Sequence, residues 1–201
     1  MPRLLLATGN AGKVREIRAI LGEAGWEIVT PAEAGVGIPP IVESGRTYAE
    51  NAIAKAVSTA RETGLPTLAD DSGIEVDALD GAPGVTSAYY GGPGMRNDGD
   101  RNALILKRLE GVPFARRIAY FRAVVALVLP GGRAFTREGL VPGHIAEAPR
   151  GANGFGYDPI FLLPDGRTMA EVGDEKLRIS HRALALASLR PVLEQLKSSL
   201  D

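Results

Sequence analysis

The sequence predicts an α/β protein with a mixed β-sheet, organised as one domain over residues 1–201. Short apolar runs alternate with stretches of helical periodicity through the first third of the chain. A long apolar run near the middle is followed by a double-glycine turn, which is typical of a strand hairpin. The chain contains no repeat or low-complexity tract and no linker that would separate domains.

The amino-terminal segment is predicted to form a strand, a helix and a second strand. Arg3–Ala7 is a short apolar run that stops at a glycine-containing turn, and Trp26–Thr30 is the second strand. Between them, three apolar residues share one helix face: Val14, Ile17 and Leu21. Pro31–Gly45 is rich in glycine and proline, so we expect a loop.

A second helix and a third strand follow this loop. Thr47–Glu50 has the form of a capping box, an apolar stripe continues to Ala60, and Gly64 ends the helix. Leu65–Ala69 is then predicted to be a strand that ends at Asp70–Gly73.

The second half begins with a glycine-rich loop, Gly81–Gly99, before a helix over Arg101–Leu109. Ile118–Leu129 is predicted to be a buried central strand, and Gly131-Gly132 turns it into Arg133–Leu140.

The carboxy-terminal part contains a further hairpin and a long helix. Pro159–Leu163 precedes a Pro-Asp-Gly turn, which favours a hairpin. The tail is helical from Ser180, and Pro191 either kinks this helix or starts a second one.

Composition excludes several classes of function. The net charge of −1 gives no sign of the broad positive field of nucleic-acid binders. There is no cysteine and there are two histidines, which excludes disulfides and thiolate chemistry and disfavours a histidine metal site. No apolar run approaches membrane-spanning length, and the apolar stretch at the amino terminus is too short for a secretory signal. We expect a cytoplasmic protein with no nucleic-acid or membrane partner.

The turn Thr8–Lys13 combines glycines, a helix start and a lysine, which suits a phosphate. It departs from a P-loop because Ala7 replaces the first glycine and Val14 the metal-binding hydroxyl. The alternative is a tight turn whose lysine faces water.

The adjacent carboxylates of Asp70 and Asp71 suit a magnesium site. On an extended chain they point in different directions, so one can hold a metal while the other orients water. The alternative is a loop in which an aspartate caps a turn.

Two later segments carry aromatic and basic groups. Gly151–Pro159 places an aromatic pair among glycines, which suits base stacking, although both rings could instead lie in the core. In Lys176–Arg182, Ser180 is a natural N-cap. Cations in the first turn of the next helix oppose its dipole and suggest an anion, or a solvated basic patch.

Lys55 shares a helix face with Asn51 and could meet phosphate or water.

Taken together and in this order, the segments resemble the inosine/xanthosine triphosphate pyrophosphatase family over nearly the whole chain. The segments that carry the resemblance are TGNAGK (8–13), YAENAIAKA (48–56), LADDSGIEVDAL (68–79), GAPGVTS (81–87), GFGYDP (154–159) and SHR (180–182). The likeness departs at Tyr89, where an arginine often stands in the family.

The resemblance implies an elongated mixed sheet with flanking helices, in two lobes around a nucleotide cleft, and a homodimer. It also implies Mg²⁺-dependent conversion of ITP, dITP and XTP to the monophosphate and pyrophosphate. By resemblance, Asp71 is the general base, and the metal ligands are Asp71, Asp70 and Glu43. The implied substrate-binding residues are Thr8, Gly9, Asn10, Ala11, Gly12, Lys13, Lys55, Ser72, Phe155, Gly156, Tyr157, Asp158, Lys176, His181 and Arg182.

The expected chemistry is in-line attack of water on the α-phosphorus, with cations and metal screening the charge. Selectivity would come from the six-keto group of the purine. Two rivals stay open at this point. One is a nucleotide-binding module without turnover, and the other is a P-loop-like phosphotransferase, which would act on the γ-phosphoryl group.

Overall fold

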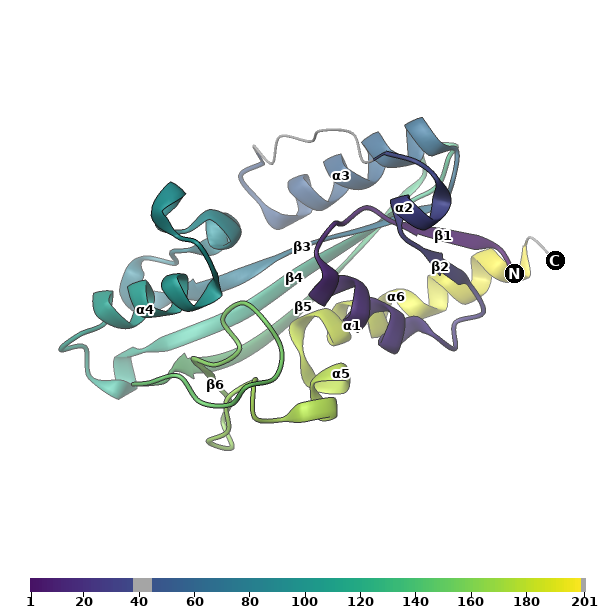
Figure 1. Cartoon of the computed structure of the whole chain (residues 1–201). Coiled ribbons are helices and arrows are strands. Elements are labelled where there is room, and N and C mark those ends of the chain that lie inside the picture. Colours follow the sequence, from purple (N-terminus) through teal and green to yellow (C-terminus); the bar gives the residue numbers. More distant parts are fainter. Residues whose placement is uncertain (38–44, 200–201) are drawn as a thin grey trace. The chain divides into compact units, whose positions relative to one another are not determined.

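The chain folds around a six-stranded mixed sheet in the computed structural model, which describes residues 1–37 and 45–199 (Figure 1). The strand order is β2-β1-β3-β4-β5-β6. Strand β1 pairs in parallel with β2 and β3, whereas β5 and β6 are antiparallel. The predicted α/β fold with a mixed sheet is confirmed.

The strands are β1 Arg3–Leu6, β2 Glu27–Val29, β3 Thr67–Val76, β4 Ile118–Val128, β5 Ala134–Ile145 and β6 Phe161–Leu162. The α-helices are α1 Ala11–Leu21, α2 Pro31–Ala34, α3 Tyr48–Thr63, α4 Asp98–Arg108, α5 Lys176–Ile179 and α6 His181–Ser198. Short 3₁₀ turns cover Asp77–Leu79, Gly84–Tyr89, Gly92–Gly94, Phe114–Arg116 and Gly173–Glu175.

The chain divides into two units, each assembled from separate stretches. The first contains Met1–Asp71, Ala123–Gly139 and His181–Asp201. The second contains Ser72–Arg122 and Leu140–Ser180. Three of the boundaries fall inside β3, β4 and β5, so no linker separates the units.

The first unit has a core of aliphatic side chains between its strands and two of its helices. Helices α1 and α6 pack against each other, and both contribute to this core. Trp26 is buried here and donates its indole N–H to the carbonyl of Leu193, 3.1 Å away. The strand residues of the core include Leu4, Leu6, Leu68, Val125 and Leu127.

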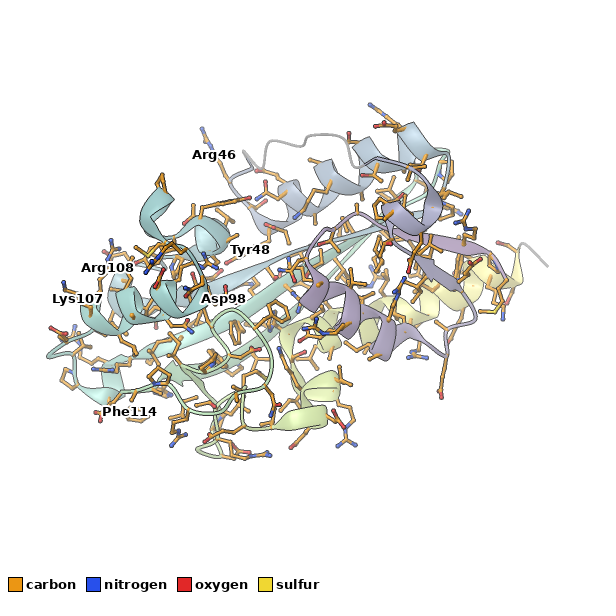
Figure 2. All side chains as sticks on the ribbon, viewed as in Figure 1. Arg46, Tyr48, Asp98, Lys107, Arg108 and Phe114 are labelled. Carbon is orange, nitrogen blue, oxygen red and sulfur yellow. The ribbon has the colours of Figure 1, made fainter. Side chains whose placement is uncertain are left out.

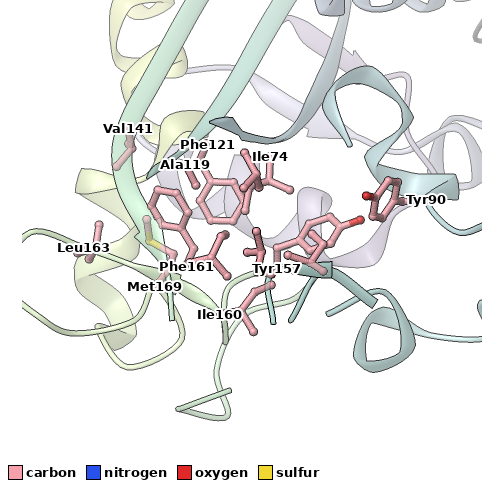
Figure 3. Close-up of a cluster of buried hydrophobic side chains, with 14 of the residues drawn as sticks. Ile74, Tyr90, Ala119, Phe121, Val141, Tyr157, Ile160, Phe161, Leu163 and Met169 are labelled. Carbon is pink, nitrogen blue, oxygen red and sulfur yellow. The ribbon is translucent and has the colours of Figure 1, made fainter. Parts of the chain in front are cut away.

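The second unit has its own core, which is richer in aromatic rings (Figure 3). Phe121 and Phe161 pack ring against ring with centroids 4.2 Å apart. Tyr157 is buried beside them, and Figure 3 shows its hydroxyl directed toward Tyr90. Around them lie Ile74, Ile105, Val141, Ile160 and Met169.

The structure differs from the predicted elements in several places. Pro31–Ala34 is a short helix with a Thr30/Glu33 capping box instead of loop. Helix α4 begins at Asp98, three residues before the predicted start, because Asn97 caps it by accepting the Asp100 N–H. Helix α6 continues through Pro191, so a second helix starting there is wrong.

Strand β3 does not end before the aspartate pair, as the sequence predicted, but runs through it to Val76. The neighbouring strand β1 does end at Leu6, beside Leu68. The aspartates therefore lie just beyond the carboxyl end of a parallel strand, although their own strand continues. The other predicted strands and helices agree with the structure within a few residues. They are β1, β2, α1, α3, β4 and the hairpin into β5.

Candidate active site

Asp70 is the centre of a buried ionic cluster in the first unit. Its carboxylate pairs with Lys13 of α1 through Oδ1 and with Arg182 of α6 through Oδ2, where the Nε–Oδ2 distance is 3.0 Å. None of its side chain is exposed, and 1 % of the Arg182 side chain is. Because this carboxylate is buried between two cations, it interacts with them and not with water.

The charges of this cluster shift the pKa values of its members. Burial alone would raise the pKa of Asp70, but Arg182 and Lys13 hold it well below the ordinary 3.8. Burial, with Arg182 and Lys55 nearby, lowers the pKa of Lys13 despite its pairing with Asp70. Asp70 is therefore an anion at any ordinary pH and a poor proton acceptor.

Asp71 points to different partners, as alternation along a strand requires. Its Oδ1 accepts from Lys55 Nζ at 3.0 Å, and its Oδ2 accepts from Asn51 Nδ2 at 3.1 Å. Both partners lie on α3, four residues apart and on one face. Burial raises the pKa of Asp71 above 3.8, against the opposing effect of Lys55.

Solvent reaches some members of the cluster and not others. The side chains of Lys13, Lys55 and Asp71 are 16 %, 11 % and 8 % exposed. The buried Asp70 positions the two lysines. Lys13 pairs with its carboxylate, and Lys55 donates to its backbone carbonyl at 2.9 Å. Two ammonium groups and one carboxylate, each with some solvent exposure, thus lie close together.

The basic start of α6 is balanced by carboxylates of the chain itself. Arg182 Nη1 lies 2.5 Å from Glu16 Oε2, and these two carboxylates, Glu16 and Asp70, raise the pKa of Arg182 despite its burial. The carboxylates of Glu16 and Asp70 are therefore the anions that the basic start of α6 suggested. His181 is the first residue of α6 and is 5 % exposed.

The Thr8–Lys13 turn is shaped by its own side chains. Asn10 is the N-cap of α1 and accepts the Lys13 N–H at 3.0 Å, and Thr8 Oγ1 accepts the Asn10 N–H at 3.2 Å. Gly9, Asn10 and Ala11 are exposed, while Gly12 is buried. The turn directs the Lys13 side chain back to β3.

The aromatic loop lies in the second unit. Asp158 is buried and accepts the Phe155 N–H at 2.8 Å, and it pairs with Lys176 Nζ. That ammonium group also lies over the Phe155 ring, 4.7 Å from its centroid. Gly154 has a φ of +81°, and a Cβ there would overlap the Asp158 carboxylate. Ser72, the first residue of this unit, is half-buried in β3.

Gly156 and Tyr157 are held by residues that the sequence did not single out. Gly156 donates to Asp98 Oδ2 at 2.6 Å, and its carbonyl accepts from Asn102 Nδ2 at 3.1 Å. The Tyr157 hydroxyl donates to the Ser87 carbonyl at 2.6 Å, and burial raises the Tyr157 pKa. The sequence allowed both rings to lie in the core instead of facing a base. Tyr157 does lie in the core, whereas Phe155 is half-buried.

Asn51 and Glu16 were also missed as site residues. Asn51 stands four residues before Lys55 and three after a helix start, and Glu16 stands three after Lys13. In each case the signal is a polar residue on the same helix face as a basic one. That signal is common on exposed helices, so it did not stand out.

Within residues 1–37 and 45–199, no group of three or more histidine or acidic side chains could by itself hold a metal. Asp71 fits a hard cation, because each of its carboxylate oxygens accepts one hydrogen bond and has capacity for more. Asp70 fits less well, since Lys13 and Arg182 occupy it. Glu43 lies outside the described residues.

In the same described ranges, no helix is both long and apolar enough to cross a lipid bilayer.

Known proteins resemble this chain along almost its entire length. A dITP/XTP pyrophosphatase of Thermus thermophilus is 50 % identical over 189 residues, covering 93 % of this chain and 89 % of that protein. One of Symbiobacterium thermophilum is 50 % identical over 200 residues, covering 99 % and 97 %. A solved HAM1 protein from Coxiella burnetii is 40 % identical with a TM-score of 0.85, covering 97 % of this chain and all of that one.

The Ham1 protein of Staphylococcus aureus is also similar in structure, with a TM-score of 0.82 and 36 % identity over 96 % of this chain and 98 % of that one. The Ham1 family model matches residues 4–192, which include most of both units and nearly all of the residues discussed above. The protein therefore belongs to the Ham1 family.

Proposed function

We propose that this protein is a nucleoside triphosphate pyrophosphatase that cleaves dITP, ITP and XTP to the monophosphate and pyrophosphate. The observation that carries the proposal is the different environment of two adjacent carboxylates. Asp70 is neutralised by Lys13 and Arg182, whereas Asp71 has a raised pKa and some solvent access. Curated relatives with 50 % identity are dITP/XTP pyrophosphatases.

In this proposal Asp71 is the general base. It accepts a proton from water as the water oxygen bonds to the α-phosphorus. The bond from that phosphorus to the bridging oxygen breaks, and its electron pair leaves with pyrophosphate. A raised pKa makes Asp71 a better proton acceptor than an ordinary aspartate, and Asn51 and Lys55 fix its orientation.

The cations of the first unit hold the triphosphate. Lys13 and Lys55 are the accessible ammonium groups, and the Thr8–Lys13 turn presents the start of α1. Arg182 supports them by sharing Asp70, and it would be a further contact of the phosphates. Phe155–Asp158 and Lys176 recognise the purine, with Ser72 and His181 as further contacts.

We further propose Mg²⁺ as the metal, held by Asp71 and by phosphate oxygens of the substrate, with Glu43 as a second carboxylate. Bound metal would supply charge neutralisation at the phosphates. A nucleotide cleft between two lobes, a homodimer and a cytoplasmic location also stay predictions. The mass of the purified protein in solution, against 21.2 kDa for one chain, tests the dimer.

The test is turnover of dITP, ITP, XTP, dGTP and dATP with Mg²⁺ in water enriched in ¹⁸O. We expect dITP, ITP and XTP to be cleaved, with pyrophosphate as the product and the label in the nucleoside monophosphate. Label in pyrophosphate would place the attack on the β-phosphorus and contradict the mechanism. Release of orthophosphate would favour a γ-phosphoryl reaction, and binding without products would favour a regulatory module.

A further inference from the structure

Helix α4 makes a paired contact with the loop that carries Phe155 and Tyr157. Asp98 and Asn102 stand four residues apart on α4 and therefore on one face. Together they bond both polar backbone groups of Gly156: Asp98 accepts the N–H at 2.6 Å, and Asn102 donates to the carbonyl at 3.1 Å. Figure 2 labels Asp98 at the start of this helix.

At Gly156 itself, hydrogen bonds restrain the backbone and side-chain packing does not. This glycine has no side chain to pack, its φ of +64° lies in the left-handed region, and a Cβ there would meet no atom within 4 Å. Glycine has more conformational freedom to lose than any other residue, so two hydrogen bonds at this position remove freedom that packing cannot.

The contact is built into the unit on both sides. Asn102 is 4 % exposed, so its bond to the loop is shielded from water. Asp98 also pairs with Arg101, one turn along the helix, which fixes its carboxylate. On the loop side, Phe155 is tied to Asp158 and Tyr157 to Ser87.

We propose that Asp98 and Asn102 are positioning residues for base recognition, which hold Gly156 so that Phe155 and Lys176 meet the purine in one fixed arrangement. The inference rests on the proposed function. It deepens that function by giving α4 a part in binding the base and not the phosphates. Helix α4 carries none of the expected substrate-binding residues.

The experiment compares Asn102→Ala and Asp98→Ala with wild type, using dITP turnover and two product inhibitors. Deoxyinosine monophosphate carries the base, and pyrophosphate does not. We expect each variant to raise the KM for dITP and the inhibition constant of deoxyinosine monophosphate by about 3- to 10-fold, the effect of one lost hydrogen bond. The kcat and the inhibition constant of pyrophosphate should stay within about twofold.

Two further variants separate positioning from general stability. Asp98→Asn keeps an oxygen that can accept the Gly156 N–H, so it should recover most of the loss seen with Asp98→Ala. Asp100→Ala removes a carboxylate from the same helical turn, but this one accepts the Arg96 N–H, whereas Asp98 accepts that of Gly156. It should leave both inhibition constants unchanged, and thermal unfolding of each variant reports any loss of fold.

Equal weakening of both inhibitors, or no change in either, would overturn the positioning role. So would an Asp100→Ala variant that behaves like Asp98→Ala. If wild type cleaves none of the purine triphosphates, the proposed function fails and this inference fails with it. Normal wild-type turnover with unaltered variants overturns the inference alone.

Discussion

Asp70 and Asp71 are neighbours in the chain, yet their side chains meet different groups. Asp70 faces Lys13 and Arg182 and is closed to solvent, whereas Asp71 faces Asn51 and Lys55 and is 8 % exposed. Alternation along β3 separates them, because successive side chains of a strand point to opposite faces. Under the proposed function, Asp70 has a structural role and Asp71 has the chemical one.

At the residue scale, replacing Asp71 with asparagine should remove turnover and keep binding. The amide cannot accept the proton of the attacking water, although it retains the size of the aspartate. We expect kcat for dITP to fall by at least about 10²–10³-fold, with pyrophosphate inhibition changed little. Steady-state kinetics measure both, and turnover at the wild-type rate would show that Asp71 is not the base.

The same substitution at Asp70 should act on stability. Asp70→Asn leaves Lys13 and Arg182 without their shared carboxylate, and breaking a buried pair costs about 3–5 kcal/mol. Denaturant unfolding at neutral pH should show a loss of that order. For Asp71→Asn we expect a much smaller change, because its carboxylate is partly solvated and faces one cation. Similar losses for both variants would contradict the distinction.

The stabilisation by Asp70 should also depend on pH. Its pKa in the folded protein is below the ordinary 3.8, so its contribution is complete above 3.8 and disappears as the pH falls through the lowered value. The difference in unfolding free energy between wild type and Asp70→Asn should therefore narrow steadily below pH 3.8. Measurements in EDTA exclude metal effects, and a gap that widens in acid would refute this account.

At the scale of elements, the position of α6 depends on one glycine of β5. A Cβ on Gly139 would overlap the carbonyl oxygen of His181 and approach the Ala185 nitrogen, both near the start of α6. That turn also carries Arg182, which holds Asp70 and Glu16. The close approach of strand and helix thus sets where the guanidinium lies.

Gly139→Ala should therefore displace the start of α6. We expect a loss of about 1–3 kcal/mol in stability, as for other overpacked sites, and a fall in kcat/KM because the Asp70–Arg182 pair moves. Gly131→Ala is the matched control in the same unit, since a Cβ there meets nothing within 4 Å. Thermal unfolding and dITP kinetics test the pair, and a Gly139→Ala protein equal to the control would show that the helix adapts freely.

At the scale of the whole molecule, the proposed reaction needs a metal that the described part of the chain does not fully ligate. Asp71 supplies one carboxylate, and within residues 1–37 and 45–199 no group of three acidic or histidine side chains could by itself hold a metal. EDTA should abolish turnover of dITP, and added Mg²⁺ should restore it. The melting temperature should change little on EDTA treatment alone, because the ionic cluster is complete without metal. Full activity in EDTA would sink the metal requirement.

Family resemblance implies two lobes, but the boundaries of the two units could not be located in the sequence, for a physical reason. Their boundaries lie within β3, β4 and β5, where the chain continues as regular strand and composition does not change. Domain boundaries are read from exposed, polar or flexible segments, and this chain has none at those points.

What the sequence determined by itself was the class of fold, and it predicted the residue types of the candidate site. Apolar periodicity located β1, α1, α3 and the β4–β5 hairpin, because side-chain burial repeats with the geometry of each element. Cap residues placed the start of α3 at Tyr48 and its end before Gly64, since these bonds are local. Local pattern and family resemblance also predict the candidate site residues Lys13, Lys55, Asp71 and Arg182.

The tertiary structure alone decided which charges meet. Lys13 and Lys55 could each have faced water, and only the packing of α1, α3 and α6 beside β3 directs them to Asp70 and Asp71. The same holds for Asp98 and Asn102, whose partner Gly156 lies more than fifty residues along the chain. Local pattern specifies a residue's own backbone, whereas a long-range pair depends on how distant elements pack, which periodicity does not encode.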